Sequence, residues 1–355
     1  MDERPAGDTG AGPAVTELPR GTVPEIVPAD DLLHPATDDW WETETAWFSF
    51  NIPERRIGGW FYNQVLATQG VCNGGAWIWD DSPTEALYSA RHQGLPLPDV
   101  QRVDLRDARL PNGNHLQVVE PLRSYRVRYS DPGSFEADLR FDGIMAPNAH
   151  PIGVAPFWRG RHFDQPMLVT GTITLHGEHL EVDCLSVRDR SWGPRPQGPD
   201  PRKPVPAADA PERAKPTKPR RPPEGVGYPF ATADDRNGWL LYSRPTVVDG
   251  VASDEISTGY LLRDGEYGHL VSGRRRTWLD STTRWIRRIE IEATDEHGRE
   301  LEAGGELVAR HGIDPVTSGT GLYRWRWDGL DGWGEDQTYA PQGILDALDR
   351  SAPTR

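Results

Sequence analysis

The sequence is poor in the residues that form cross-links, and it contains no long hydrophobic run. Its 355 residues include only two cysteines, Cys72 and Cys184, which lie far apart in the chain. Two such thiols do not make a disulfide framework or a zinc site. No segment approaches the roughly 20 apolar residues that a membrane span needs, and the first residues lack the apolar core of a signal peptide. We therefore expect a cytoplasmic protein without a membrane span.

Basic charge is also scarce, and the usual cofactor motifs are missing. The chain has 39 basic and 54 acidic residues, which gives a net charge of −15. A negative field of this size repels phosphate backbones, so we expect no nucleic-acid partner. The sequence contains no glycine-rich phosphate loop and no nucleophile elbow, and its ten histidines are scattered. It therefore predicts no cofactor and no bound metal.

Tryptophan, in contrast, is abundant. The chain has 14 tryptophans but only 8 phenylalanines and 3 methionines. Large rings bury much surface while they fix few rotatable bonds. We expect most of these rings to fill hydrophobic cores and the remainder to line a ligand pocket.

Composition divides the chain into several segments. The N-terminal segment has no hydrophobic periodicity and cannot bury enough surface to fold. A later segment holds ten prolines, which block both helices and strand ladders. We predict a disordered tail, a first β domain, a proline-rich linker or loop, a second β domain and a closing tail, at residues 1–30, 31–195, 196–224, 225–345 and 346–355.

Short runs of β-branched and aromatic residues between Gly, Pro and Asp turns predict strands in both halves. The clearest hairpin joins 167–175 to 179–187 through a turn at 176–178, where Gly177 can take a positive φ. One short helix is predicted at 83–93, since Ser82 and Glu85 form a capping-box pattern. The fold class is therefore all-β, with two antiparallel barrels or sandwiches.

The predicted hairpin gathers residues that can do proton chemistry. Its two ends meet, so His162 and Asp164 should lie beside Asp189 and Trp192. A carboxyl group held against an indole in an apolar cavity has a raised pKa and can act as a general acid. A nearby aromatic face can stabilise a developing cation.

A structural role for Asp189 is an equal alternative at this point. Arg188, Arg190 and Arg195 are close in sequence, and inward-facing arginines would make Asp189 an ionised salt-bridge partner. The apolar positions of 179–187 change parity partway along the strand. That change indicates a β-bulge and leaves the inward face after it undetermined.

A longer pattern resembles a known superfamily. The pattern is His162-x-Asp164-Gln165-Pro166, then Gly171, then Arg188-Asp189-x-Ser191-Trp192-Gly193. It resembles the lipocalin-like superfamily that contains hydroxyneurosporene synthase-type carotenoid hydratases, AttH-like proteins and kievitone-hydratase-like proteins. Residues 332–337 resemble the closing element of a bacterial branch of that superfamily.

The resemblance implies two lipocalin-like domains packed together around an apolar ligand cavity. It also implies that Asp189 protonates a double bond, with His162 and Trp192 as its catalytic neighbours. We further expect the substrate to be bound by Asp164, Gln165, Arg190, Trp158, Trp77 and Trp47. The family commonly has His after the aspartate, whereas this chain has Arg190, which would lower the pKa of Asp189 if it pointed at the carboxyl group.

Three functions follow as hypotheses. The first is a cofactor-independent hydratase, isomerase or cyclase that acts on a hydrophobic small molecule of terpenoid, prenylated or polycyclic type. The second is a non-catalytic lipocalin-like carrier of an apolar small molecule. The third is an interaction protein whose proline-rich segment docks as a polyproline II ligand, although a spacer is the simpler interpretation of that segment.

Overall fold

The structure is a computed structural model. It describes residues 21–82, 86–154, 156, 160–196, 200–202, 225–248, 251–280, 282–283, 285–314 and 318–339. Most of the predicted linker, the closing tail and Trp158 lie outside the described residues. No described helix is long and apolar enough to cross a membrane.

Within the described ranges the first domain consists of eleven strands and four short 3-10 helices. The strands are β1 (Glu42–Ile52), β2 (Ile57–Leu66), β3 (Val71–Trp79), β4 (Tyr88–Pro96), β5 (Ala108–Arg109), β6 (Asn114–Glu120), β7 (Ser124–Asp131), β8 (Phe135–Gly143), β9 (Asn148–Ala149), β10 (Arg161–Leu175) and β11 (Glu178–Pro194). The 3-10 helices are η1 (Pro28–Asp31), η2 (Pro53–Arg55), η3 (Ala67–Gln69) and η4 (Val100–Arg102).

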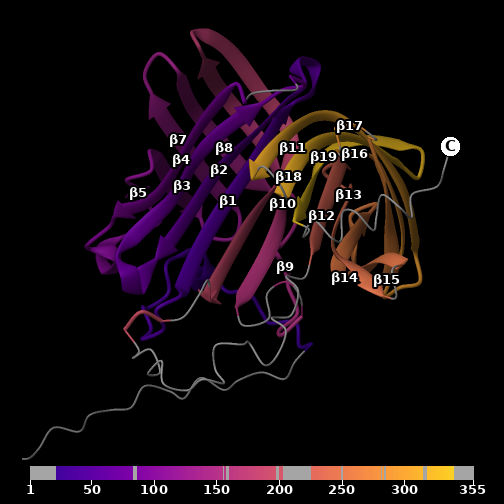
Figure 1. Ribbon diagram of the computed structural model, residues 1–355, viewed down its shortest axis with the longest axis horizontal. Helices are drawn as coiled ribbons and strands as arrows, with labels where there is room; N and C mark the ends of the chain where they lie inside the picture. The colour runs from indigo at the N-terminus through magenta and orange to yellow at the C-terminus, as the bar shows by residue number, and fades with distance from the viewer. Residues whose placement is uncertain are drawn as a thin grey trace, which may run out of the picture.

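These strands form one strongly curved antiparallel sheet (Figure 1). Its order is β4-β3-β2-β1-β11-β10-β8-β7-β6-β5, and β9 pairs with β10. Side chains alternate between the two faces of each strand. In β1, Ala46, Phe48 and Phe50 pack into the core of the first domain. Thr45, Trp47 and Ser49 therefore lie on the opposite face of the same strand.

The second domain is a closed eight-stranded barrel in the described part of the chain. Its strands are β12 (Val226–Asp234), β13 (Asn237–Val248), β14 (Val251–Arg263), β15 (Glu266–Leu279), β16 (Ile286–Asp295), β17 (Glu300–Asp314), β18 (Ser318–Trp327) and β19 (Leu330–Tyr339). Each strand pairs with the next and β19 pairs with β12, so the barrel has no free edge. Trp239 and Trp325 are fully buried in its core.

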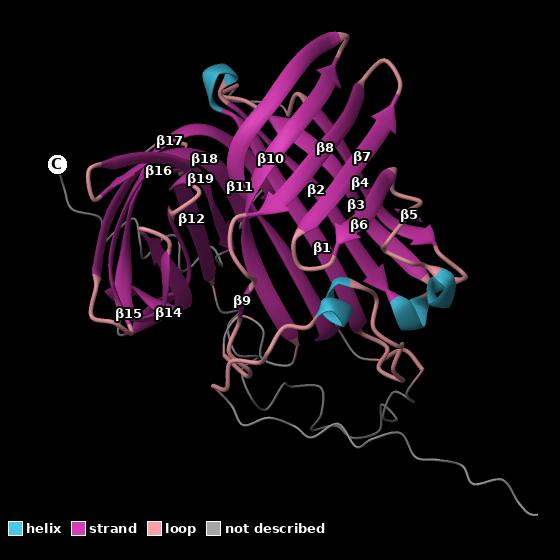
Figure 2. Ribbon diagram, turned by 180° about the vertical axis from the view of Figure 1, so that it is seen from behind, coloured by secondary structure: helices cyan, strands magenta, loops and turns pink. Residues whose placement is uncertain are grey.

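The two domains share a third hydrophobic cluster. Trp47, Trp60 and Trp79 of the first domain pack there with Tyr228 and Phe230 of the second. Strand β11 lies beside β12 and β19, as both overall views show (Figures 1 and 2). The all-β prediction of two lipocalin-like domains packed together is confirmed.

Two local predictions were wrong. Tyr88–Pro96 is an edge strand, β4, because backbone pairing with β3 outweighs the local helix signal of the preceding capping-box pattern. Residues 83–85 of that predicted helix lie outside the described residues. The predicted bulge in the 179–187 strand is also missing, because β10 and β11 pair without a register shift.

The parity change in β11 has a different cause. Val182 and Cys184 face the core of the first domain, whereas Val187 faces the cluster between the domains. One face of β11 is therefore buried by the first domain, and farther along the strand the opposite face is buried by the second barrel. The change in which positions are apolar is caused by this second barrel and not by a β-bulge.

The predicted disordered tail also differs from the structure. Residues 1–20 lie outside the described part, but Gly21 and Thr22 pair with Ile152. The 3-10 helix Pro28–Asp31 is anchored by an ion pair of 2.8 Å between Asp31 and Arg188. Composition alone does not reveal this anchor, since its partner lies in the distant strand β11.

Candidate active site

A cavity of about 350 Å³ lies between the two domains, a size that suits a small organic ligand. We call it the interdomain cavity. Seven of its fourteen lining residues are aromatic. The lining residues are Thr45, Trp47, Trp60, Tyr62, Trp77, Pro156, Asp189, Ser191, Arg195, Val226, Tyr228, Tyr242, Gln337 and Tyr339.

Strand register places two carboxyl groups side by side at this cavity. Asp189 of β11 pairs with Asp164 of β10 on one side and with Trp47 of β1 on the other. Directly paired residues point to the same face of a sheet. His162 pairs with Ser191 one position along the same face. The predicted adjacency of His162 and Asp164 to Asp189 is therefore found.

Tyrosines of the second barrel reach across to this face. The hydroxyl groups of Tyr228 and Tyr242 donate to Oδ1 of Asp164, at 2.7 and 3.1 Å. The Tyr242 hydroxyl also lies 2.6 Å from Nε2 of His162. That nitrogen is 2.9 Å from Oδ1 of Asp164. The two tyrosine rings stack with centroids 4.7 Å apart, so the second barrel caps the carboxyl pair.

Burial controls the protonation of these groups, because it disfavours the charged form of each. It raises the pKa of Asp164 to about 7 and that of Asp189 to about 6, and it lowers the pKa of His162 to about 3. The charge of Asp164 further raises the pKa of Asp189, while Arg195 lowers it. The carboxyl pair (Asp164 and Asp189) thus retains a proton close to neutral pH, beside a neutral imidazole.

Only one member of the carboxyl pair can touch a ligand. Asp164 is fully buried, and its Oδ2 has no hydrogen-bond partner among the described residues. Asp189 is partly exposed and lines the interdomain cavity. Accessibility therefore assigns contact with the ligand to Asp189, although Asp164 has the higher pKa.

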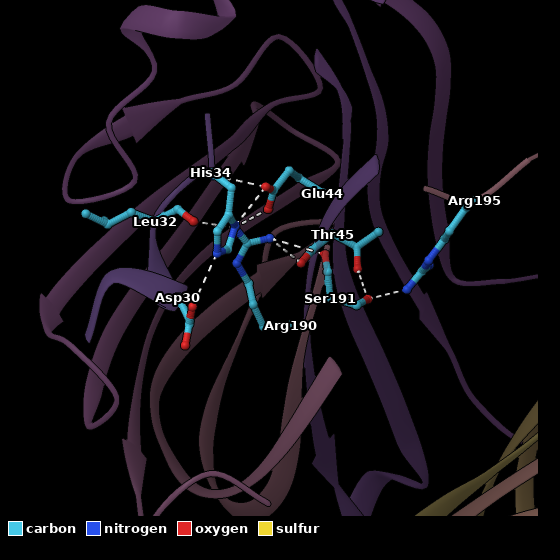
Figure 3. A network of polar contacts seen from close by, with 8 residues as sticks. All are labelled: Asp30, Leu32, His34, Glu44, Thr45, Arg190, Ser191 and Arg195. Atoms are coloured by element: carbon cyan, nitrogen blue, oxygen red, sulfur yellow. Dashed lines mark hydrogen bonds and ion pairs between the residues drawn. The ribbon is translucent and has the colours of Figure 1, made fainter. Parts of the chain in front are cut away.

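The two arginines that flank Asp189 point away from it, into the first domain. Arg188 pairs with Asp31, and Arg190 pairs with Glu44 at 2.5 Å. Figure 3 shows Arg190 beside Glu44, Asp30 and His34, on the far side of Ser191 from Arg195. The salt bridge between Asp189 and Arg190 that the sequence allowed is thus replaced by these two buried pairs.

The remaining predicted site residues divide between the two faces of the sheet. Trp47 and Trp77 line the interdomain cavity. Trp192 instead stacks on His34, with centroids 4.5 Å apart, on the face that carries Arg190. Gln165 donates to the carbonyl oxygens of Leu122 and Met145 at 2.8 Å. The indole next to Asp189 is therefore Trp47 rather than Trp192, because strand parity turns Trp192 to the opposite face.

Sequence reasoning missed the residues that the second barrel contributes. Tyr228, Tyr242 and Tyr339 lie on β12, β13 and β19, where buried residues follow one another without a clear alternation. Their role at the cavity depends on how the two domains pack, which no local pattern encodes. Trp60 and Arg195 were also missed as lining residues, although the parity of a correct strand register would have placed Trp60 there.

The same cluster contains ligands of the kind that metals use. His162, Asp164 and Asp189 each offer one atom within 4.8 Å of the others, and within the described residues they are the only group of three that does so. Two of these atoms already exchange hydrogen bonds with each other and with Tyr242. The absence of a bound metal stays a prediction.

Several solved structures are similar to this one. An AttH-like protein from Nitrosomonas europaea has a similar structure, with a TM-score of 0.55 and 14% identity over 93% of this chain and 99% of that chain. Kievitone hydratase from Nectria haematococca has a TM-score of 0.49 and 11% identity, over 91% and 95% of the two chains. CghA has a TM-score of 0.48 and 12% identity, over 85% and 89%.

The likeness to the AttH-like protein shows a shared fold, so the resemblance seen in the sequence is confirmed at the level of the fold. Residues 27–202 match a family described as Domain of unknown function (DUF7064). No curated protein matches the sequence significantly.

Proposed function

We propose that this protein is an enzyme that protonates a hydrophobic small molecule in the interdomain cavity, with Asp189 as the proton donor. The reaction class is hydration, dehydration, isomerisation or cyclisation, and the residues described here supply its chemistry without a cofactor. One observation carries the proposal. A carboxyl group with a raised pKa faces a cavity lined by aromatic rings, while Arg188 and Arg190, which flank it in sequence, pair elsewhere.

The chemical step is simple to balance. The π electrons of a substrate double bond take the proton of Asp189, which forms a C–H bond and leaves a carboxylate and an adjacent carbocation. Water then adds to the cation and releases a proton to the carboxylate, or the cation loses a neighbouring proton to it. The faces of Trp47, Trp60 and Trp77 can stabilise the cation by cation–π attraction.

Asp164, which does not reach the cavity, helps Asp189 to act as a proton donor. Two carboxyl groups that share a site cannot both ionise easily, so one keeps a proton at a pH where a solvated aspartic acid would be charged. The Tyr228 hydroxyl stabilises the charged form of Asp164. Burial nevertheless keeps the pKa of Asp164 above that of Asp189. The shared proton therefore rests mainly on Asp164, and Asp189, which faces the cavity, is the group that passes it to the substrate. His162, which stays neutral, holds the same oxygen of Asp164 in place.

A non-catalytic carrier would bind its ligand in the same cavity, but it would have no need of the carboxyl pair. Burial of unpaired or half-paired carboxyl groups costs stability. A carrier gains nothing from two of them, with raised pKa values, in its binding cavity. The carboxyl pair is therefore the feature that favours catalysis over simple transport.

Asp189→Asn tests the proposal directly. General acids contribute roughly 100- to 10,000-fold to a rate, so turnover should fall by at least about 100-fold while the fold and ligand binding persist. Asp183→Asn, an exposed aspartate on the same strand, is the matched control and should keep full activity. Substrates are found by incubating the protein with a terpenoid and prenylated-phenol panel and following mass and retention time.

Three outcomes would contradict the assignment. Unchanged turnover in Asp189→Asn would remove Asp189 from the mechanism. Binding of panel ligands that are always recovered unchanged would favour the carrier. Loss of wild-type activity in a chelator, restored by a divalent metal, would show that His162, Asp164 and Asp189 act as metal ligands instead.

A further inference from the structure

The interdomain cavity has a polar end in addition to its carboxyl pair. Thr45 of β1 and Ser191 of β11 pair in register, and their hydroxyl oxygens are 2.6 Å apart. The guanidinium of Arg195 donates to the same Ser191 hydroxyl. Figure 3 shows Arg195 reaching this hydroxyl pair from the side opposite Arg190. All three residues line the cavity, so a ligand meets a cation and two hydroxyl groups at this end.

Strand geometry fixes how far this polar end lies from the acid. Ser191 follows Asp189 by two positions on the same face of β11, and Thr45 stands in the same relation to Trp47. A strand rises about 3.3 Å per residue, so the two points are about 7 Å apart. That distance spans roughly five to six carbon–carbon bonds of an extended chain, or an aromatic ring with one substituent.

We infer that the substrate is an amphipathic acid, an apolar body that carries a carboxylate or phenolate oxygen, and that Arg195 with Ser191 binds this oxygen about 7 Å from the carbon that Asp189 protonates. This inference rests on the proposed function of the cavity. Arginine suits the role because its planar fork of five N–H donors matches a carboxylate. It can hold the ligand while it keeps its bond to Ser191.

The electrostatics couple this anchor to the acid. The charge of Arg195 lowers the pKa of Asp189 and also that of Tyr62 on the facing wall. An anion bound to Arg195 offsets that charge, so the acid holds its proton more firmly once the substrate is in place. The anchor therefore supports protonation of the correct ligand as well as its orientation.

Matched acids and esters test the anchor. Farnesoic acid and abietic acid, one linear and one polycyclic, are titrated beside their methyl esters at pH 8, where the acids are ionised. Binding is followed by quenching of the cavity tryptophans. A hydrogen bond to a charged group contributes about 1.5–3 kcal/mol, which corresponds to roughly 10- to 150-fold at about 1.4 kcal/mol per tenfold. Wild type should prefer the acids by at least about 10-fold.

Variants locate the preference. Arg195→Gln should weaken binding of the acids by about 10-fold or more and change binding of the esters by less than about 2-fold. Arg195→Lys should keep part of the preference. Arg106→Gln removes one positive charge from an exposed loop and should leave both affinities unchanged.

Several results would overturn the inference. Equal binding of acids and esters by wild type, or failure of both acids to bind, would do so. An equal loss for acids and esters in Arg195→Gln would show that Arg195 only packs against the ligand. Asp189→Asn separates this inference from the proposed function, since it should keep the acid preference. If that variant retains turnover, the acid assignment fails while the anchor stands.

Discussion

At the scale of single residues, two aspartates of the same type have different roles because of what surrounds them. Asp164 is enclosed by His162 and by two tyrosine hydroxyl groups, whereas Asp189 meets the interdomain cavity. Both have pKa values raised mainly by burial. Such a pair titrates as a unit, so its behaviour belongs to both residues together.

Tyr228→Phe is a residue-scale test of that coupling. The Tyr228 hydroxyl stabilises the ionised form of Asp164, so its removal raises the pKa of that carboxyl group. The pair then keeps its last proton to higher pH, and the alkaline limb of the pH–rate profile should move up by about one unit, since one pKa unit is about 1.4 kcal/mol. The maximal rate should fall, because the proton spends more time on Asp164.

The control for this measurement is Tyr323→Phe. Tyr323 is also buried, but its hydroxyl donates to the backbone of Ile286 in the core of the second barrel. Loss of the Tyr323 hydroxyl should leave the alkaline limb of the pH–rate profile at the same pH. A Tyr228→Phe profile whose limb stays fixed or moves to lower pH would show that Asp164 does not share the catalytic proton.

At the scale of elements, the hairpin of β10 and β11 decides which side chains enter the site. Its two-residue turn has positive φ at both His176 (51°) and Gly177 (87°), which matches the twist of the flanking strands. A slip of one residue would turn Asp189 away from the cavity and bring Arg190 into it. The chemistry of the site therefore depends on register over the whole hairpin.

Gly171 is a position in β10 where an added side chain would disturb this strand pairing. It lies in β10 with φ of 139°, and a Cβ atom there would lie 2.2 Å from the carbonyl oxygen of Asp138. Gly171→Val should therefore destabilise the protein by about 2 kcal/mol or more, measured as the midpoint of urea unfolding. Thr172→Val, at the exposed next position, should change stability by less than about 0.5 kcal/mol. Equal midpoints for the two variants would show that β10 relaxes at this position.

How far the sequence predicts this site depends on the range of the interactions involved. The turn at His176-Gly177 is local, so the adjacency of Asp164 and Asp189 could be predicted from it. The direction in which the Trp192 side chain points could not be predicted from the sequence. The second barrel covers the opposite face of β11 from the one that the first domain covers, so the apolar face changes along the strand. The positions of Tyr228 and Tyr242 depend on contacts between domains, and no pattern within either strand reports them.

At the scale of the whole molecule, Glu335 is a second buried acid, besides Asp164, that joins the two domains. Glu335 of β19 accepts hydrogen bonds from Ser49 at 2.5 Å and from the indole of Trp60 at 2.6 Å, both in the first domain. Thr320 donates to it from within the barrel. Burial raises the pKa of Glu335 to about 8. This contact also holds Trp60, which lines the cavity, in a fixed orientation.

Glu335→Gln should make stability less sensitive to pH. The folded protein keeps the proton of Glu335 up to about pH 8, whereas an unfolded glutamate releases it near 4.5. The free energy of unfolding therefore decreases as pH rises between these values, by up to about 1.4 kcal/mol per pH unit for one group. Asp164 and Asp189 act in the same direction, so the difference between wild type and variant isolates Glu335.

The measurement is urea unfolding at pH 5, 6.5 and 8. The Glu335→Gln slope should be shallower than that of wild type, while Glu302→Gln, at an exposed position of β17, should follow wild type. Identical slopes for all three proteins would mean that Glu335 does not retain its proton on folding.

The division of the cavity between two barrels has an evolutionary consequence. The acid, its partner Asp164 and the tryptophan wall come from the first domain, while the tyrosine cap comes from the second. Substitutions on the inner surface of one barrel can thus alter ligand shape and proton affinity without touching the acid itself. The fold separates the reactive group from the surface that adjusts it, so new specificities can arise by drift in β12, β13 and β19 while the reaction is preserved.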